Sequence, residues 1–184
     1  LAAATGEADA AVDEIRRQLS QDFGQDEFFG GGLTIRATVD PALQGVAARA
    51  LQSALESYDR GRGIWHGVIA KLKPEDLTSE AAWRGALFAV KDAPRDVEGW
   101  MPAVVLAAEG GDARIGIEGI EEDADGHWIP AKDAQWARPR LADGKLGARA
   151  QGAGDLVQPG DVVMVRAMTE DGTGKFVRWT LRQV

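Results

Sequence analysis

The chain has 184 residues, a formal net charge of −8 at pH 7, no cysteine and two histidines. The lack of cysteine excludes disulfides and cysteine-ligated zinc or iron–sulfur sites, and the acidic balance disfavours a general nucleic-acid binder, whose phosphate contacts need a basic surface. With 45% hydrophobic and 27% charged residues, the composition is typical of a globular protein of one medium domain or two small ones.

No apolar stretch approaches the roughly 18 to 20 residues that a transmembrane helix needs, so we expect no membrane insertion within this chain. The amino end has neither a basic start nor a long apolar core, as a signal peptide would have. A complete protein of this kind would be cytoplasmic. The first residue is Leu1 rather than Met, however, so we expect a piece of a longer protein. The missing signals then say nothing about the compartment of that longer protein.

The amino-terminal part predicts a helix followed by a strand. Apolar residues recur at helical spacing between residues 8 and 19, and the helix should end near Gly24, because glycine adopts the left-handed conformation of a C-cap. Residues 33–39 alternate apolar and polar side chains, which predicts a strand with one buried face. The glycines at 30–32 permit a tight chain reversal; a phosphate cradle would need a following Lys-Ser/Thr and a helix.

A second helix is predicted over residues 41–60. Asp40 is a favourable N-cap, and Pro41 suits the first helical position. The apolar residues form one continuous stripe at spacings of three and four: Leu43, Val46, Ala47, Ala50, Leu51, Ala54, Leu55 and Tyr58. We expect residues 8–60 to pack beside or beneath the second half of the chain.

The middle of the chain predicts a short strand over residues 64–72, ended by Lys73-Pro74. A weaker helix should follow over residues 80–88, with Thr78 or Ser79 as its N-cap. Residues 91–99 are polar and contain proline and glycine, which indicates a linker.

From residue 100 onward the hydrophobic period changes to that of β-structure. Strands are predicted at 101–108, 113–118, 127–129, 162–167 and 175–183, with turns at 109–112 and 158–161 and a helical turn at 133–137. Five short strands with a helical insert before the fourth favour a small Greek-key barrel of the OB type. The predicted fold class is therefore α+β: a helical segment with one strand, plus a five-stranded antiparallel barrel. We expect the strand of residues 33–39 to pair with the last strand.

Candidate catalytic and metal-binding groups are few. Glu121, Glu122, Asp123 and Asp125 could hold a cation, but they lack the spacing of a calcium loop, and a solvated turn is favoured. Residues 171–175 superficially match a phosphate loop but lack the Ser/Thr after the lysine, so a turn is favoured there too. No serine has a credible base partner. We therefore expect no catalytic residue, no metal and no cofactor.

The six tryptophans are scattered along the chain, and packing in the core or at its rim is the favoured interpretation. Use of one or two exposed tryptophans to bind a partner remains open. The candidate partner surface comprises Trp65, His66, Trp100, His127 and Trp128.

Several segments together resemble class A penicillin-binding proteins, type 1A members in particular. In the amino-terminal part they are Glu14-Ile-Arg-Arg-Gln-Leu19, Phe23-Gly24, Phe29-Gly-Gly-Gly-Leu-Thr-Ile-Arg-Ala-Thr-Val-Asp-Pro-Ala-Leu-Gln44, and Tyr58-Asp-Arg-Gly-Arg-Gly with the following Trp-His-Gly. In the second half they are Trp100-Met-Pro-Ala-Val-Val-Leu, Trp136-Ala-Arg138, Pro159-Gly-Asp-Val-Val-Met-Val165 and Trp179-Thr-Leu-Arg-Gln-Val184. Residues 74–99 match weakly, and Ala37 stands where the family usually has threonine.

The resemblance implies that residues 1–63 are the linker between a glycosyltransferase and a transpeptidase domain, and that residues 64–184 are an OB-like domain with residues 74–99 inserted. The parent would be a periplasmic peptidoglycan synthase, anchored in the inner membrane, that polymerises lipid II and cross-links peptides. This sequence contains no Ser-x-x-Lys, Ser-x-Asn, Lys-Thr-Gly or Glu-Asp-x-x-Phe motif. No catalytic residue is therefore carried over, and this chain should not be an enzyme.

Two functional hypotheses follow. The first is a non-catalytic linker and docking module whose partners are the parent's catalytic domains and, as in some relatives, an outer-membrane lipoprotein activator or another cell-wall synthesis protein. The alternative is a free-standing OB-type domain that binds glycan strands or single-stranded nucleic acid. The charge of −8 speaks against nucleic acid.

Overall fold

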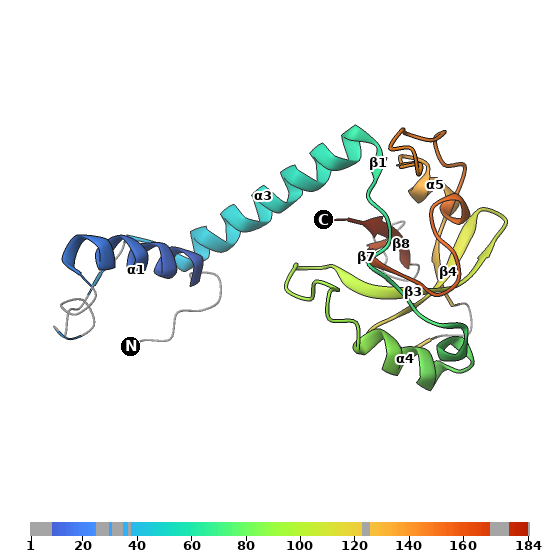
Figure 1. The fold of residues 1–184 in the computed structure, drawn as a ribbon, viewed down its shortest axis with the longest axis horizontal. Coiled ribbons are helices and arrows are strands. Elements are labelled where there is room, and N and C mark those ends of the chain that lie inside the picture. Colours follow the sequence, from blue (N-terminus) through green and yellow to red (C-terminus); the bar gives the residue numbers. More distant parts are fainter. Residues whose placement is uncertain are drawn as a thin grey trace. The chain divides into compact units, whose positions relative to one another are not determined.

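The computed structural model describes residues 9–24, 30, 35–36, 38–122, 126–169 and 177–183. The chain divides into two compact units, Leu1–Leu55 and Glu56–Val184. The boundary lies inside one long helix, α3 (Figure 1). None of the helices in the described ranges is both long enough and apolar enough to cross a bilayer.

The first unit contains helix α1 (Asp9–Phe23) and most of helix α3 (Pro41–Arg62). Both helices were predicted, and their caps follow the sequence signals. Gly24 has φ +78°, the left-handed conformation that ends α1. The Asp40 carboxylate accepts hydrogen bonds from the backbone N–H groups of Ala42 (2.9 Å) and Leu43 (3.3 Å), as expected of an N-cap.

The strand predicted over residues 33–39 is not formed in the part of that stretch that the structure describes. Ile35, Arg36, Thr38 and Val39 belong to no strand, and Ile35 is 46% exposed. The last strand pairs with a different partner, described below. Alternating apolar and polar side chains favour a strand, but a strand forms only where a neighbouring strand can pair with its backbone N–H and C=O groups. Residues 33, 34 and 37 lie outside the described residues.

The apolar stripe predicted on α3 is present, but its large side chains are exposed rather than packed. The exposed members are Leu43, Val46, Leu51, Leu55 and Tyr58. The half-buried positions near the end of the helix are polar instead, and include Glu56, Asp59 and Arg60. The helical periodicity thus predicted the helix correctly. It did not predict which face of the last turns of α3 contacts the rest of the second unit.

The second unit is built on a six-stranded, antiparallel sheet with the order β2-β7-β3-β4-β5, and β8 also pairs with β7 (Figure 1). Its strands are β2 (Ala70–Lys71), β3 (Met101–Glu109), β4 (Asp112–Ile117), β5 (His127–Ile129), β7 (Asp161–Thr169) and β8 (Val177–Arg182). Two further short strands, β1 (Ile64–Trp65) and β6 (Arg138–Pro139), pair in parallel. The predicted α+β class is confirmed.

The predicted five-stranded barrel differs from the observed sheet in two ways. The sheet gains a sixth strand, β2, and it is not closed, because β5 and β8 lie close together without forming a ladder among the described residues. Side chains fill the space between them instead: the His127 ring stands edge-on to the Trp179 ring, with centroids 5.8 Å apart. The strand path from β8 through β7, β3 and β4 to β5 is nevertheless that of an OB-type barrel left open at one seam.

The strand predicted over residues 64–72 is split into β1 and β2. Gly67 lies between them with φ +109°, a conformation that a continuous strand does not contain. The two halves therefore join different sheets: β1 pairs with β6, and β2 pairs with β7.

Residues 74–99 pack against the sheet rather than standing apart from it. After a short 3₁₀-helix, η2 (Pro74–Leu77), helix α4 (Glu80–Phe88) begins at Ser79, whose hydroxyl accepts a hydrogen bond from Ala82 N. Trp83 and Leu87 of α4 are buried against the sheet. Gly116 of β4 makes this possible, because a Cβ there would lie 2.7 Å from the Trp83 ring.

The principal core lies between the sheet and two short helices, α5 (Ala131–Ala134) and the 3₁₀-helix η3 (Ala153–Asp155). The helical turn predicted at 133–137 corresponds to α5, which begins two residues earlier and ends three residues earlier. The largest fully buried side chains, some of them in two smaller clusters, are those of Leu87, Ile115, Ile117, Ile129, Met164, Leu181, Val104, Val105, Val157, Val162, Val163 and Val165. Their contribution is hydrophobic burial, at about 25 cal/mol per Å² of apolar surface removed from water.

Candidate docking surface

The predicted partner residues divide into buried and accessible ones. Trp65 and Trp100 are only 4% and 7% exposed, so they belong to the core and not to the surface. Trp65 stands edge-to-face with Trp136, with ring centroids 6.5 Å apart. The indole N–H of Trp100 donates to Glu56 (2.9 Å). A tryptophan of the core buries more apolar area than an exposed one, and sequence position alone did not distinguish the two.

His127 and Trp128 lie together on β5 and are half-buried. A ring nitrogen of His127 is 3.0 Å from the carbonyl oxygen of Glu121, and its ring contacts Trp179. His66 is exposed and follows β1, which pairs with β6 rather than with the six-stranded sheet. The accessible members of the predicted surface are therefore His66, His127 and Trp128.

His66 sits at a small polar junction. Its Nε2 is 3.2 Å from the Asp59 carboxylate, and its backbone N–H donates to the side-chain oxygen of Gln183 (2.9 Å). The amide group of Gln183 also donates to Asp59 and to the carbonyl oxygen of Ile64 (2.7 Å). One glutamine thus connects α3, the start of β1 and the end of β8.

Beside His66 lies a surface groove of about 360 Å³. Its lining combines main chain at Gly67 and Gly154, apolar side chains at Val68 and Leu156, and the charged Arg140. The remaining lining residues are Trp65, His66, Pro139, Asp155, Val157, Gln158 and Asp161. The groove lies close to the β3–β4 turn, because Ala153, which precedes the lining residue Gly154, donates to the Gly111 carbonyl (2.7 Å).

Glu56 is a largely buried carboxylate with several charged and polar partners. It accepts hydrogen bonds from both terminal nitrogens of Arg166 (3.0 and 2.9 Å) and from the Trp100 indole, and Arg182 Nε is 3.4 Å away. Its side chain is 11% exposed. A two-pronged arginine–carboxylate pair is stronger and more directional than a single contact. Glu56 therefore fastens the last turns of α3 to β7, β8 and the start of β3.

Arg60, one turn further along α3, reinforces this attachment. Its guanidinium donates to Thr180 Oγ1 (3.1 Å) and to the Leu181 carbonyl (3.2 Å), and it lies 4.9 Å from the centroid of the Trp136 ring. Burial lowers the pKa of Arg60, and burial together with neighbouring Arg60 lowers the pKa of Arg182. The normal pKa of arginine is so high that both side chains remain charged near neutral pH.

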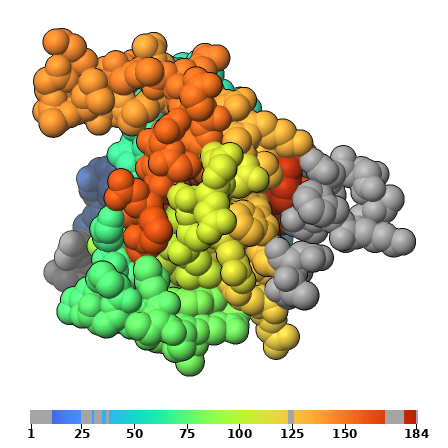
Figure 2. All heavy atoms as spheres, turned by 90° about the vertical axis from the view of Figure 1, so that its right-hand side faces the viewer, coloured from blue at the N-terminus to red at the C-terminus, as the bar shows by residue number. Residues whose placement is uncertain are grey.

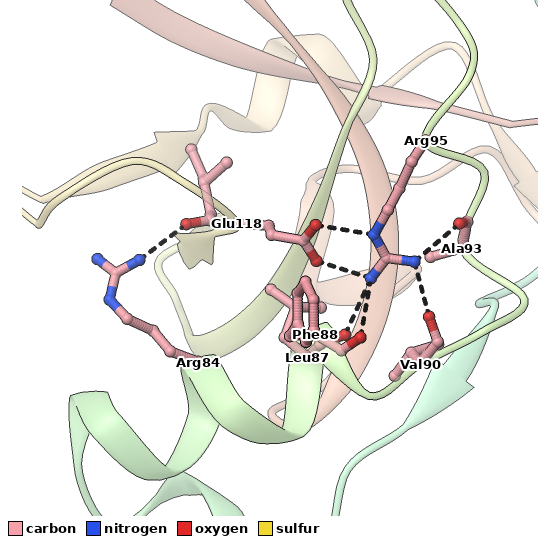
Figure 3. Close-up of polar contacts among 8 residues, drawn as sticks. Arg84, Leu87, Phe88, Val90, Ala93, Arg95 and Glu118 are labelled. Carbon is pink, nitrogen blue, oxygen red and sulfur yellow. Dashed lines mark hydrogen bonds and ion pairs between the residues drawn. The ribbon is translucent and has the colours of Figure 1, made fainter.

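Another arginine, Arg95, holds the loop that follows α4 (Figure 3). Its guanidinium makes two hydrogen bonds to the Glu118 carboxylate (2.8 and 2.7 Å). It also donates to four carbonyl oxygens, those of Val90, Ala93, Leu87 and Phe88. The last turn of a helix leaves carbonyl groups without partners, and Arg95 supplies partners for them.

We expect Arg95→Ala to lower the unfolding free energy of the second unit by about 1 to 2 kcal/mol, since several hydrogen-bonded groups lose a charged donor while remaining partly accessible to water. Urea unfolding followed by tryptophan fluorescence would measure the loss. Arg149→Ala serves as the control, because this exposed arginine should change stability by less than about 0.5 kcal/mol. Equal effects of the two substitutions would show that the Arg95 contacts do not stabilise the loop.

The described residues contain no group of three or more histidine, aspartate or glutamate side chains placed to hold a metal ion. Within the acidic turn, Glu122 pairs with Arg114 (2.9 Å), and residues 123–125 lie outside the described residues. The loop of residues 171–175 also lies outside them.

Sequence inspection missed Glu56, Arg60, Arg166, Arg182 and Arg95. The available signal was a charged residue, Glu56, placed immediately after apolar Leu55 on a long helix. That signal does not identify a partner, because Arg166 and Arg182 are more than a hundred residues away. Only the fold brings these charges together.

Comparison with known proteins identifies this architecture. A family model described as "Penicillin-binding protein OB-like domain" matches residues 65–184. The chain is 28% identical over 177 residues to penicillin-binding protein 1A of Vibrio cholerae, covering 94% of this chain and 20% of that protein. It is 30% identical over 146 residues to penicillin-binding protein 1A of Rickettsia typhi, covering 79% of this chain and 16% of that protein. The chain thus spans about a fifth of the length of these relatives.

The crystal structure of penicillin-binding protein 1A from Haemophilus influenzae has a similar fold, with a TM-score of 0.59 and 20% sequence identity. The similarity covers 96% of this chain and 22% of that one. The resemblance seen in the sequence is confirmed. Because the family match takes in well over half of its length, the chain belongs to the family of penicillin-binding protein OB-like domains.

Proposed function

We propose that this chain is a non-catalytic linker and docking module of a bifunctional peptidoglycan synthase. The observation that carries the proposal is the family match over residues 65–184 in a sequence without any motif of the transpeptidase or glycosyltransferase sites. In this proposal residues 1–63 join the two catalytic domains, and residues 64–184 form the OB-like domain between them. The parent is anchored in the inner membrane and acts in the periplasm, where it polymerises lipid II and cross-links peptides.

The contacts at the end of α3 support a spacing role. Glu56, Asp59 and Arg60 attach the last turns of this helix to strands β7 and β8 through charged and hydrogen-bonded groups. The end of the helix is therefore fixed to the OB-like domain. The partners proposed are the parent's own catalytic domains and an outer-membrane lipoprotein activator or another protein of cell-wall synthesis.

Binding of bases or sugars by stacked tryptophans receives no support. Trp65, Trp83, Trp100 and Trp179 are all at most 7% exposed, and the remaining two, Trp128 and Trp136, are half-buried. A stacking platform needs aromatic faces open to solvent beside basic groups. We therefore propose no second function of this kind.

The non-catalytic role predicts that a fluorescent penicillin will not label this chain covalently, because no acylatable serine site is present in its sequence. Gel fluorescence after incubation would show it, with a full-length class A penicillin-binding protein as the positive control. A covalent band on the 184-residue chain would overturn the proposal.

The docking role requires a test in the full-length parent. Replacing residues 65–184 by a flexible Gly/Ser linker should preserve penicillin labelling of the transpeptidase domain but abolish the ability of the protein to support cell-wall synthesis in a strain that depends on it. A linker-substituted protein that supports normal growth would contradict a docking and spacing role.

A further inference from the structure

A small hairpin that stands out from the second unit is positively charged, although the chain as a whole is acidic. It begins with β6 and is shown in orange at the upper edge of Figure 2. Its backbone is well defined by hydrogen bonds from Gly147 N to Pro139 O (2.8 Å) and from Leu141 N to Lys145 O (2.8 Å). Gly144, with φ +81°, forms its tip. We call residues 138–149 the basic hairpin.

The basic hairpin carries Arg138, Arg140, Lys145 and Arg149 against a single acid, Asp143, although the whole chain has a net charge of −8. Lys145 is paired with Asp143 (3.2 Å), and Arg138 donates to the Gly147 carbonyl (3.0 Å). Arg140 and Arg149 are exposed, and neither forms an ion pair within the part of the chain that the structure describes. The hairpin thus offers cations that the rest of the described structure does not neutralise.

Apolar surface adjoins these cations. Leu141 and Leu146 of the hairpin are 48% and 37% exposed, and Val68 across the groove is 38% exposed. Pro139 and Arg140 line the groove itself, so the groove begins at the base of the hairpin. Two carboxylates also line the groove: Asp155 accepts from Gln151 N (2.7 Å), and Asp161 accepts from Gln158 N (2.7 Å) and lies 3.4 Å from Lys71 Nζ.

We propose that the basic hairpin and the adjoining groove bind a short acidic segment of a partner protein, with its carboxylates on Arg140, Lys145 and Arg149 and an apolar side chain in the groove. The inference rests on the docking function proposed above and names its surface and the chemistry of its partner. Arginine is the side chain best suited to this role, because its planar guanidinium matches the two oxygens of a carboxylate.

A short segment fits these observations better than an anionic membrane. Electrostatic attraction at physiological salt extends over about 8 Å. A short segment bound at the hairpin is therefore attracted by its cations and is little repelled by acidic residues elsewhere on the chain. A lipid surface would extend beyond the hairpin and face the acidic remainder of the chain. Stable membrane attachment also needs more buried apolar area than two partly exposed leucines provide.

The test uses this 184-residue chain and a phage-displayed library of random 12-residue peptides. The most enriched peptides are synthesised with a fluorescent label, and their affinity is measured by anisotropy. One variant carries Arg140→Glu, Lys145→Glu and Arg149→Glu. A matched control carries Arg36→Glu, Lys73→Glu and Lys91→Glu, which changes the net charge equally at exposed positions outside the hairpin. Melting curves of both variants exclude unfolding as the cause of any loss.

We expect the enriched peptides to be acidic and to contain an apolar residue. The hairpin variant should bind them at least tenfold more weakly and the control variant within twofold of wild type. Raising the salt to 1 M, where attraction extends over only about 3 Å, should also weaken binding. Enrichment of peptides without acidic residues, or equal affinity of the two variants, would overturn the proposal. So would hairpin-dependent binding to vesicles of phosphatidylcholine with 30% phosphatidylglycerol in the absence of acidic peptides.

Failure of this inference is distinguishable from failure of the proposed function. If replacing residues 65–184 abolishes function of the full-length protein while the three hairpin substitutions leave it intact, docking takes place on another surface. If neither change has an effect, the docking function itself is wrong.

Discussion

Replacing Glu56 by alanine should lower the unfolding free energy of the second unit by about 3 to 5 kcal/mol. The substitution leaves Arg182, whose side chain is only 10% exposed, without its carboxylate, and it removes the acceptor of the Trp100 indole. Loss of one partner of a buried ion pair is costly because the remaining charge stays in a poorly solvated place. Arg166, at 30% exposure, can recover part of its interactions with water.

Urea unfolding monitored by tryptophan fluorescence measures this effect selectively, since all the tryptophans lie between residues 65 and 179 and report on the second unit alone. Glu75→Ala is the matched control: its side chain is 69% exposed, so the change should be under about 0.5 kcal/mol. Glu56→Gln retains an acceptor and should fall between the two. A loss below about 1 kcal/mol for Glu56→Ala would show that α3 is held by other contacts.

Gly152→Ala is expected to cost about 3 kcal/mol or more, or to prevent folding of the second unit. A Cβ at this position would overlap the Gly111 carbonyl oxygen and lie 2.7 Å from Gly111 Cα. These are backbone atoms of the β3–β4 turn, and Ala153 N donates to the same carbonyl (2.7 Å). The turn cannot yield by a side-chain rotation, so the overlap must separate η3 from the sheet.

Gly154→Ala provides a control two residues away. Its added Cβ would meet the Ala108 side chain at 3.6 Å, an ordinary contact, and the change should be nearly neutral. Melting temperature and urea midpoint for both variants give the comparison. A Gly152→Ala protein as stable as the Gly154→Ala protein would mean that the β3–β4 turn and η3 are not rigidly joined.

The sequence predicted most of the second unit because its signals are local. The β3–β4 hairpin follows from an apolar run before Gly110 and Gly111 and an alternating segment after them, and both glycines have positive φ. Ser79 as the N-cap of α4 likewise depends only on residues within one turn. The family resemblance agreed with the OB-type barrel that the strand pattern already favoured, and it supplied the family.

Apart from the strand over residues 64–72, which Gly67 interrupts with φ +109°, the predictions that failed concern contacts between distant residues. Residues 33–39 alternate as a strand would, yet β8 pairs with β7, because pairing depends on which edge is available and not on the alternation itself. The stripe of α3 is apolar, yet its large side chains are exposed while Glu56 and Arg60 make the contacts. The burial of Trp65 and Trp100 follows from the same assembly.

By itself, therefore, the sequence determined the α+β class, the caps and turns, the family and the absence of catalytic motifs, since these depend on neighbouring residues or on recognisable strings. Only the tertiary structure decided that the sheet has six strands and an open seam. It also decided that Glu56 is surrounded by Arg166, Arg182 and Trp100. Finally, it placed Val68 and the basic hairpin at the border of one groove. The physical reason is that charge pairing and groove shape depend on distances in space, whereas periodicity and capping depend on distances along the chain.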